Sequence, residues 1–237
     1  MPFPRAKANL YDYGVRMPLA IRWGARAKPG RVIDDFVSFP DFAPTFLEAA
    51  GLPAPAAMTG RSLLPLLSGQ VDPRRDHAVF GIERHFPGSR EGGAGYPSRA
   101  FRTKDYLYIR NLTPDRTPAG DRPGPTYPAD EPVGGFGDTD GGPSKTFLWQ
   151  NRDKYPELFK LSFERRPAEE LYAVRDDPYS LQNLAADPRH AAVKKDLAAR
   201  LDRHLARTED PRATGRGHLL DEVMTRYPAL PASAPPA

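Results

Sequence analysis

A histidine with charged neighbours, just after an apolar run, is the group best placed to do chemistry. The segment Gly81-Ile82-Glu83-Arg84-His85 ends the run that begins at Ala78. Imidazole gains or loses a proton near neutral pH, and a guanidinium binds planar anions at two points. Arg84 and His85 can therefore donate a proton or bind an anion. The alternative is an ordinary histidine at the end of a strand.

A second polar segment runs from Gly137 to Thr146 and contains Asp138, Asp140 and Lys145. Its spaced carboxylates suggest half of a calcium loop, but the Asp-x-Asp-x-Asp-Gly run and the later bidentate glutamate are absent. A polar turn with flexible glycines and aspartates that cap the backbone explains the same residues.

The first third of the chain reads as part of an α/β domain. Two short extended segments are expected at residues 18–23 and 32–39, because each is apolar and bounded by Pro, Gly or polar residues. A helix is predicted over 41–51, with Asp41 as its cap and Gly51 at its end. Residues 60–69 form a short helix or turn.

Beyond residue 72 the pattern changes to β-structure. Strands are predicted at 78–83, 98–103 and 106–111, the last two joined as a hairpin by residues 103–105. A strand at 170–174 completes an antiparallel sheet. A final helix, capped by Asp187, should pack one apolar stripe across that sheet. The stripe consists of Val193, Leu197, Leu201 and Leu205.

Composition narrows the function classes. The chain has no cysteine, which excludes disulfides, thiolate metal sites and a cysteine nucleophile within it. Its 34 basic and 30 acidic residues are interspersed, so nucleic-acid binding is not expected. A basic surface can still attract a sulfated polysaccharide, although a solvated surface of mixed charge is the simpler interpretation. No apolar run reaches the roughly 18 residues of a membrane span.

Several motifs occur in an order that resembles the sulfatases of the alkaline-phosphatase-like superfamily, within them the bacterial heparan N-sulfatase-like group. The resemblance runs from residue 2 to about 212. Tyr13 stands where most sulfatases have glycine. The motifs are Lys7-x-x-x-Tyr11-Asp12-x-Gly14-x-Arg16, Gly81-x-Glu83-Arg84-His85, Gly95-Tyr96-Pro97-x-Arg99-Ala100-x-Arg102-Thr103, the loop from Gly137 to Thr146, and Asp177-Pro178 followed by Asn183-Leu184-Ala185.

The resemblance implies hydrolysis of a sulfate ester or sulfamate, and it assigns roles to single residues. Lys7 becomes the sulfate-binding catalytic lysine, whereas on its own it would be a solvated surface charge. A lysine there offsets charge that grows in the transition state. The residues that the resemblance places against substrate are Arg84, His85, Arg99, Asp138, Asp140 and Lys145.

The family also implies a formylglycine made in a Cys/Ser-x-Pro-x-Arg motif and a calcium ion held by Asp and Asn. Gly95 stands where that motif needs Cys or Ser before Pro97, so we expect the nucleophile and the metal ligands upstream of this chain. On this view the chain is a C-terminal fragment that is inactive alone. The alternative is a non-catalytic module that binds sulfated glycans.

The expected fold is α/β, with three parts. Residues 1–71 form the C-terminal edge of a sulfatase-type α/β domain, and 72–212 form a smaller α+β subdomain with an antiparallel sheet and a packed C-terminal helix. Residues 213–237 form a flexible tail. The expected partner is a sulfated saccharide or another sulfate ester, and exposed apolar faces would favour a homo-oligomer. The family allows a periplasmic or secreted location.

Overall fold

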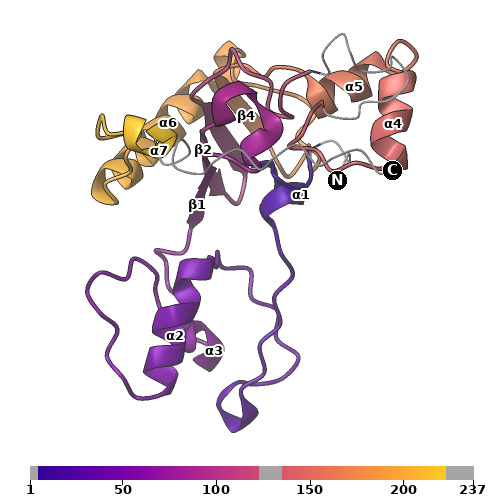
Figure 1. Cartoon of the computed structure of the whole chain (residues 1–237). Helices are drawn as coiled ribbons and strands as arrows, with labels where there is room; N and C mark the ends of the chain where they lie inside the picture. The colour runs from indigo at the N-terminus through magenta and orange to yellow at the C-terminus, as the bar shows by residue number, and fades with distance from the viewer. Residues whose placement is uncertain (1–4, 123–134, 223–237) are drawn as a thin grey trace, which may run out of the picture. The chain divides into compact units, whose positions relative to one another are not determined.

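The computed structural model describes residues 5–122 and 135–222 (Figure 1). The chain divides into two compact units. The larger comprises Met1–Arg16, Phe80–Phe101 and Asp105–Ala237, and the smaller comprises Met17–Val79 and Arg102–Lys104. The predicted domain boundaries after residues 71 and 212 stay a prediction. The predicted tail covers residues 213–237. The structure describes its first part, which contains the helix α7 (His218–Glu222), whereas residues 223–237 lie outside the described residues.

A four-stranded antiparallel sheet forms the centre of the larger unit, as predicted. The neighbouring strands β3 and β4 are antiparallel, with Tyr106 opposite Ala173 and Arg110 opposite Glu169. A connection of only two residues joins β2 to β3, which matches the predicted hairpin. In spatial order the strands are β1 (His77–Ile82), β2 (Ser98–Thr103), β3 (Tyr106–Asn111) and β4 (Glu169–Ala173).

The helix α6 (Ala191–Arg207) packs on this sheet, which confirms the prediction of a packed C-terminal helix (Figure 1). Asp187 caps the 3-10 turn η5 (Pro188–His190) that leads into it, by accepting a hydrogen bond from the Arg189 amide at 2.9 Å. Arg110 of β3 pairs with Asp202 of α6 at 2.5 Å. The buried side chains on α6 are Leu197, Leu201 and Leu205. None of the described helices combines the length and the apolar character needed to cross a bilayer.

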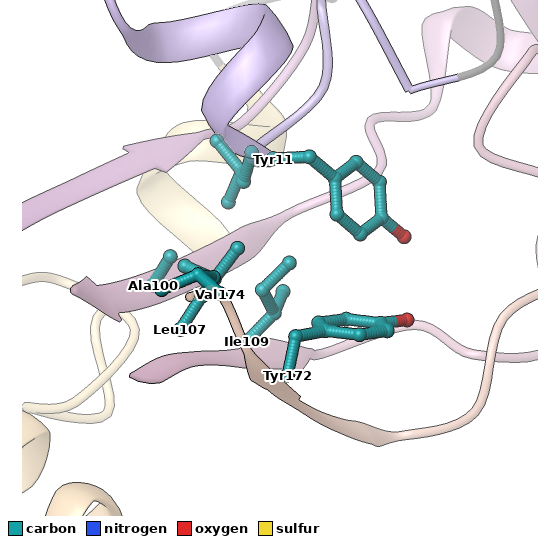
Figure 2. Packing of buried hydrophobic residues seen from close by; sticks show 7 residues of the cluster. Tyr11, Ala100, Leu107, Ile109, Tyr172 and Val174 are labelled. Carbon is teal, nitrogen blue, oxygen red and sulfur yellow. The ribbon is translucent and has the colours of Figure 1, made fainter. Parts of the chain in front are cut away.

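The N-terminal segment packs into the core of the same unit. It contains the short helix α1 (Asp12–Val15), and Tyr11 just before this helix lies against Tyr172 of β4 with the two rings edge to face at 5.8 Å. Figure 2 shows both tyrosines beside the aliphatic side chains of the sheet, with their hydroxyl groups on the same side. The other members of this core are Leu10, Ala100, Leu107, Ile109 and Val174.

A carboxylate is buried at the polar end of that core. Glu170 is 1% exposed and accepts hydrogen bonds from the Tyr11 hydroxyl at 2.7 Å, the Tyr172 hydroxyl at 2.5 Å and the Asn111 amide at 2.7 Å. Arg5 lies 3.9 Å from the same carboxylate. Burial raises the pKa of Tyr11 well above its ordinary value, so its hydroxyl remains a donor. We call this group the Glu170 cluster.

Two helices that the sequence analysis did not predict form a second core. The helices α4 (Pro143–Gln150) and α5 (Pro156–Phe163) both begin with proline, which suits the first turn of a helix. They hold a set of aromatic rings around Phe136, which stacks on Phe163 at 4.7 Å. The other members of this cluster are Ala119 and Leu148, with Trp149 and Phe159 packed against it.

The smaller unit is helical and irregular. The predicted helix over 41–51 is present as α2 (Phe42–Ala49), and α3 (Leu64–Ser68) lies within 60–69. The extended strands predicted at 18–23 and 32–39 are wrong: these residues have no strand in the structure, and two 3-10 turns, η1 (Gly24–Arg26) and η2 (Phe39–Asp41), lie nearby. A strand needs a neighbour for its backbone hydrogen bonds, and the described part of the chain gives these apolar runs none.

A buried ion pair holds the smaller unit together. Asp41 and Ser38 form a reciprocal pair of side-chain to backbone hydrogen bonds that caps the start of η2. The Asp41 carboxylate also accepts a hydrogen bond from the Arg61 backbone amide at 2.7 Å. Its partner Arg75 is 3% exposed, lies 2.7 Å from it, and donates to the carbonyls of three residues besides. Asp72 lies next to this ion pair, 3.7 Å from Arg75. Its hydrogen bond to Arg74 is the largest cause that lowers the pKa of Asp72 to about 2.

The Glu170 cluster predicts a graded loss of stability. Glu170→Ala should lower the free energy of unfolding by about 3–5 kcal/mol, because it strands a buried arginine and three donors. Tyr11→Phe removes one hydrogen bond to a charged group and should cost about 1.5–3 kcal/mol. Urea denaturation measures both values. Tyr179→Phe is the matched control, since Tyr179 is 65% exposed. If Tyr11→Phe lowered the free energy of unfolding no more than the control does, the proposed contribution of the Glu170 cluster to stability would be contradicted.

The Asp72 carboxylate predicts a pH-dependent contribution to stability. Because its folded pKa is lowered, its stabilising effect is present above about pH 4 and is lost as the pH falls towards 2. Asp72→Asn should therefore lower the melting temperature at pH 7 and have a much smaller effect at pH 2. The exposed Asp34→Asn in the same unit is the control for loss of one charge. Equal shifts for the two variants at pH 7 would show that Asp72 has no special role.

Candidate functional site

A small polar cavity lies in the larger unit, where the residues that follow Lys7 meet the end of β1. Its volume is about 20 Å³, enough for about one water molecule. A sugar ring does not fit inside, so any saccharide has to lie over its mouth. The polar side chains that line it are Asn9, Arg84, His85, Tyr96, Ser98, Asn111, Asp138 and Arg166. We call this the polar cavity.

Two buried donors in the polar cavity have no partner among the described residues. They are the hydroxyl of Tyr96, which is 6% exposed, and the Nε of Arg84. Burial raises the pKa of Tyr96 to about 12, so the hydroxyl stays protonated near neutral pH. Gly95 places Tyr96 here, because a Cβ at residue 95 would lie 2.4 Å from the carbonyl oxygen of Glu83. Unpaired buried donors are costly, and they mark a place where an acceptor would bind.

Asp138 fixes the segment that follows His85. It is 8% exposed and accepts from the Phe86 amide at 3.0 Å and from the Ser89 hydroxyl at 2.6 Å. Oδ2 of Asp138 lies 2.7 Å from Arg90 Nη1, and Oδ1 lies 3.8 Å from His85 Nδ1. Asp138 thus holds the turns η3 (Pro87–Ser89) and η4 (Glu91–Gly93) and lies beside His85 at the cavity.

Lys7 forms an ion pair with Asp140 close to the residues of the polar cavity. The Nζ–Oδ2 distance is 2.9 Å, and both side chains are about half exposed, at 55% and 48%. The bond to Lys7 is the main cause that lowers the pKa of Asp140 to about 2. Gly14 allows the turn that carries Lys7 to close on α1, because a Cβ there would lie 2.3 Å from the Asn9 carbonyl oxygen.

Lys145 closes the loop that carries Asp138 and Asp140. Lys145 is 6% exposed, and its ammonium group donates to the carbonyls of Gly135, Phe136 and Thr139 at 2.8–3.0 Å. Desolvation lowers the pKa of Lys145. Lys145 does not line the polar cavity, and its predicted contact with substrate stays a prediction.

The charge of Arg99 is likewise paired with carboxylates of the same chain. Arg99 is 7% exposed and forms ion pairs with Glu83 and, at 2.8 Å, with Asp210. Arg212 lies 2.7 Å from the second oxygen of Glu83. This network fixes the end of β1 immediately before Arg84. Arg99 does not line the polar cavity either, so its predicted substrate contact likewise stays a prediction.

The structure thus brings Arg84, His85 and Asp138 together at one cavity and pairs Lys7 with Asp140. Sequence reasoning missed Arg166 and also Tyr96, although Tyr96 lies in one of the motifs. Arg166 donates to the Asn9 side chain at 2.7 Å, and its guanidinium lies 4.9 Å from the centre of the Tyr11 ring. Only the folded chain shows that these residues face Arg84 and His85.

Comparison with known proteins agrees with the motifs. Residues 6–114 match the family model of the C-terminal part of N-sulphoglucosamine sulphohydrolase. The chain is 28% identical to an ulvan-active sulfatase of Formosa agariphila over 191 residues, which is 81% of this chain and 33% of that protein. It is 28% identical to the N-sulphoglucosamine sulphohydrolase of Homo sapiens over 235 residues, which is 95% of this chain and 43% of that protein. The chain thus spans less than half the length of these relatives.

Among solved structures, one from work on the metabolism of multiple glycosaminoglycans by Bacteroides thetaiotaomicron aligns with a TM-score of 0.49 and 21% identity. The alignment covers 82% of this chain and 32% of that one. The family match over residues 6–114 and the two sulfatase relatives support a C-terminal sulfatase-family region in this chain.

Proposed function

We propose that this protein acts as a sulfatase on sulfated saccharides and that the chain supplies residues which bind the sulfate and the sugar. The observation that carries the proposal is the combination of a half-exposed lysine, Lys7, with a polar cavity that holds two unpaired buried donors. The sulfatase relatives and the matched family model support the same assignment. The family model and the human relative favour an N-sulfated glucosamine as the sugar.

Lys7 is the proposed sulfate-binding group. Its ion pair with Asp140 is exposed, and exposed pairs contribute only about 0–1 kcal/mol. A divalent sulfate therefore replaces Asp140 at little cost. Once bound, the ammonium group of Lys7 offsets negative charge that develops on the sulfate oxygens and the leaving group. In this proposal Asp140 acts on the ligand only through Lys7.

The polar cavity is the proposed contact for the sugar. An acceptor oxygen of the saccharide would accept hydrogen bonds from the Tyr96 hydroxyl and the Arg84 Nε, which removes the cost of leaving these donors unpaired. His85 lies at the more open edge, where its side chain is 30% exposed, and it would contact a substituent of the ring. Asp138 holds His85 and the following turn in position for that contact.

The calcium ion and the formylglycine of the family are not assigned to residues of this chain. Within residues 5–122 and 135–222, no group of three or more His, Cys, Asp or Glu side chains could hold a metal ion. The polar cavity is lined by two guanidinium groups, Arg84 and Arg166, and by a single carboxylate, a set that suits an anion rather than calcium. We therefore derive no step through the metal.

Single substitutions that remove the charge of Lys7 or of Asp140 test the role of Lys7. Lys7→Ala should weaken binding of N-sulfoglucosamine about tenfold, a loss of about 1.4 kcal/mol, because the cation is removed. Asp140→Asn should leave the affinity unchanged or raise it up to about threefold, because it removes the competing carboxylate. Titration calorimetry measures both. Lys28→Ala, an exposed lysine of the smaller unit, is the matched control. Equal losses for Lys7→Ala and Lys28→Ala would refute the assignment.

Ligands of two sizes separate the sugar contact from the sulfate contact. His85→Gln should weaken binding of N-sulfoglucosamine about three- to tenfold and leave binding of inorganic sulfate unchanged, since sulfate alone has no ring substituent to contact. Lys7→Ala should weaken both. Competition between the two ligands, followed by calorimetry, gives the affinities. A His85→Gln loss of the same size for both ligands would place His85 at the sulfate instead.

A further inference from the structure

A second, open cleft lies on the same unit, beside α5. Its volume is about 430 Å³, within the roughly 300–1,000 Å³ typical of ligand pockets. No residue lines both this cleft and the polar cavity. Its lining combines the apolar residues Pro156 and Phe159 with the charged residues Arg152, Asp153, Lys160, Glu164 and Arg165. We call it the α5 cleft.

The charges of the α5 cleft favour an anion. Three cations face two carboxylates, and one of these carboxylates, Glu164, is already paired with Arg122 at 2.5 Å. Within the described ranges, 5–122 and 135–222, the side chains of Lys160 and Arg165 form no hydrogen bond or ion pair. Both side chains are exposed and free to contact a ligand.

One of the cations is held in place before any ligand arrives. Arg152 donates from Nη1 to the Trp149 carbonyl at 2.7 Å, and its guanidinium lies 4.9 Å from the centre of the Trp149 ring. A cation that is already ordered loses less entropy when an anion binds. The remaining N–H groups of its planar fork can bind a sulfate at two points.

The floor of the α5 cleft is a fixed aromatic ring. Phe159 is half buried and packs against Phe163 at 5.1 Å, Trp149 at 6.1 Å and Phe136 at 6.3 Å. These contacts hold the ring as a rigid apolar platform. Pyranose rings present an apolar C–H face and carry their charged groups around the edge. A sulfated sugar therefore matches a cleft with an apolar floor and a cationic rim.

We propose that the α5 cleft is a second binding site, which holds a sulfated polysaccharide chain at a distance from the polar cavity. The proposal rests on the proposed function only for the choice of a sulfated glycan as the occupant. A second site of this kind raises the affinity for long chains over single sugars, because one polymer can contact both places.

Paired charge removals at two places test the proposal. Lys160→Ser with Arg165→Ser should weaken binding of heparin at 0.15 M salt at least fivefold. The control is Lys195→Ser with Arg203→Ser on α6, which removes the same charge from exposed residues. Figure 1 shows α6 and α5 at opposite ends of the larger unit. The control should change the affinity less than twofold. Equal losses for the two double variants would overturn the proposal in favour of diffuse attraction by a basic surface.

Two further measurements define the occupant and separate this proposal from the previous one. Phe159→Leu should weaken heparin binding and leave binding of an inorganic polyphosphate of equal charge unchanged, since a polyphosphate has no apolar ring face to pack on the platform. Equal losses for both polymers would contradict a glycan site. The double variant at the α5 cleft should bind N-sulfoglucosamine normally, and Lys7→Ala should keep most of the heparin affinity. Loss of sugar binding in Lys7→Ala alone leaves the α5 cleft untouched.

Discussion

The burial of the Glu170 carboxylate is the constraint on which the larger unit depends. An ionised group with 1% exposure is stable only if donors surround it, and its three donors come from separate parts of the chain: Tyr11, Asn111 and Tyr172. The N-terminal segment cannot leave the sheet without stranding that charge. Arg5 and Ala8, on either side of Lys7, have φ angles of 65° and 66°, in the left-handed region that costs roughly 1–2 kcal/mol per residue. The Glu170 cluster offsets this strain and so determines where Lys7 lies.

The same physical rule sorts the charged residues of the candidate site into two kinds. Buried charges such as Asp138 and Lys145 are saturated by hydrogen bonds from loops, so they hold those loops and have little capacity left for a ligand. Exposed charges such as Lys7 and Asp140 form an ion pair that water screens. A ligand can exchange with the second kind far more easily than with the first. Binding function therefore falls on the weakly held charges, which the strongly held ones position.

Sequence reasoning predicted the parts of the fold that local pattern determines. The strands from β1 to β4 and the helix α6 follow from alternating or four-residue apolar spacing, and the structure has them within a residue or two. The helices α4 and α5 were missed, because their apolar residues form an aromatic cluster with Phe136 instead of a regular stripe. The strands expected at 18–23 and 32–39 were wrong for the opposite reason: apolar content suggested them, but a strand also needs a neighbour, which local sequence does not specify.

For the candidate site too, the sequence predicted some features and not others. The motifs pointed to the correct segments, and Arg84, His85 and Asp138 do share the polar cavity. They did not indicate which member of a motif keeps an unpaired hydrogen-bonding group: Arg99 and Tyr96 lie in the same motif, yet Arg99 forms ion pairs with Glu83 and Asp210, whereas the Tyr96 hydroxyl has no partner among the described residues. That difference depends in part on Asp210, which is 111 positions from Arg99 in the chain. A motif match thus locates a site, but only the hydrogen bonds of the folded chain show which of its residues have donors or acceptors left for a ligand.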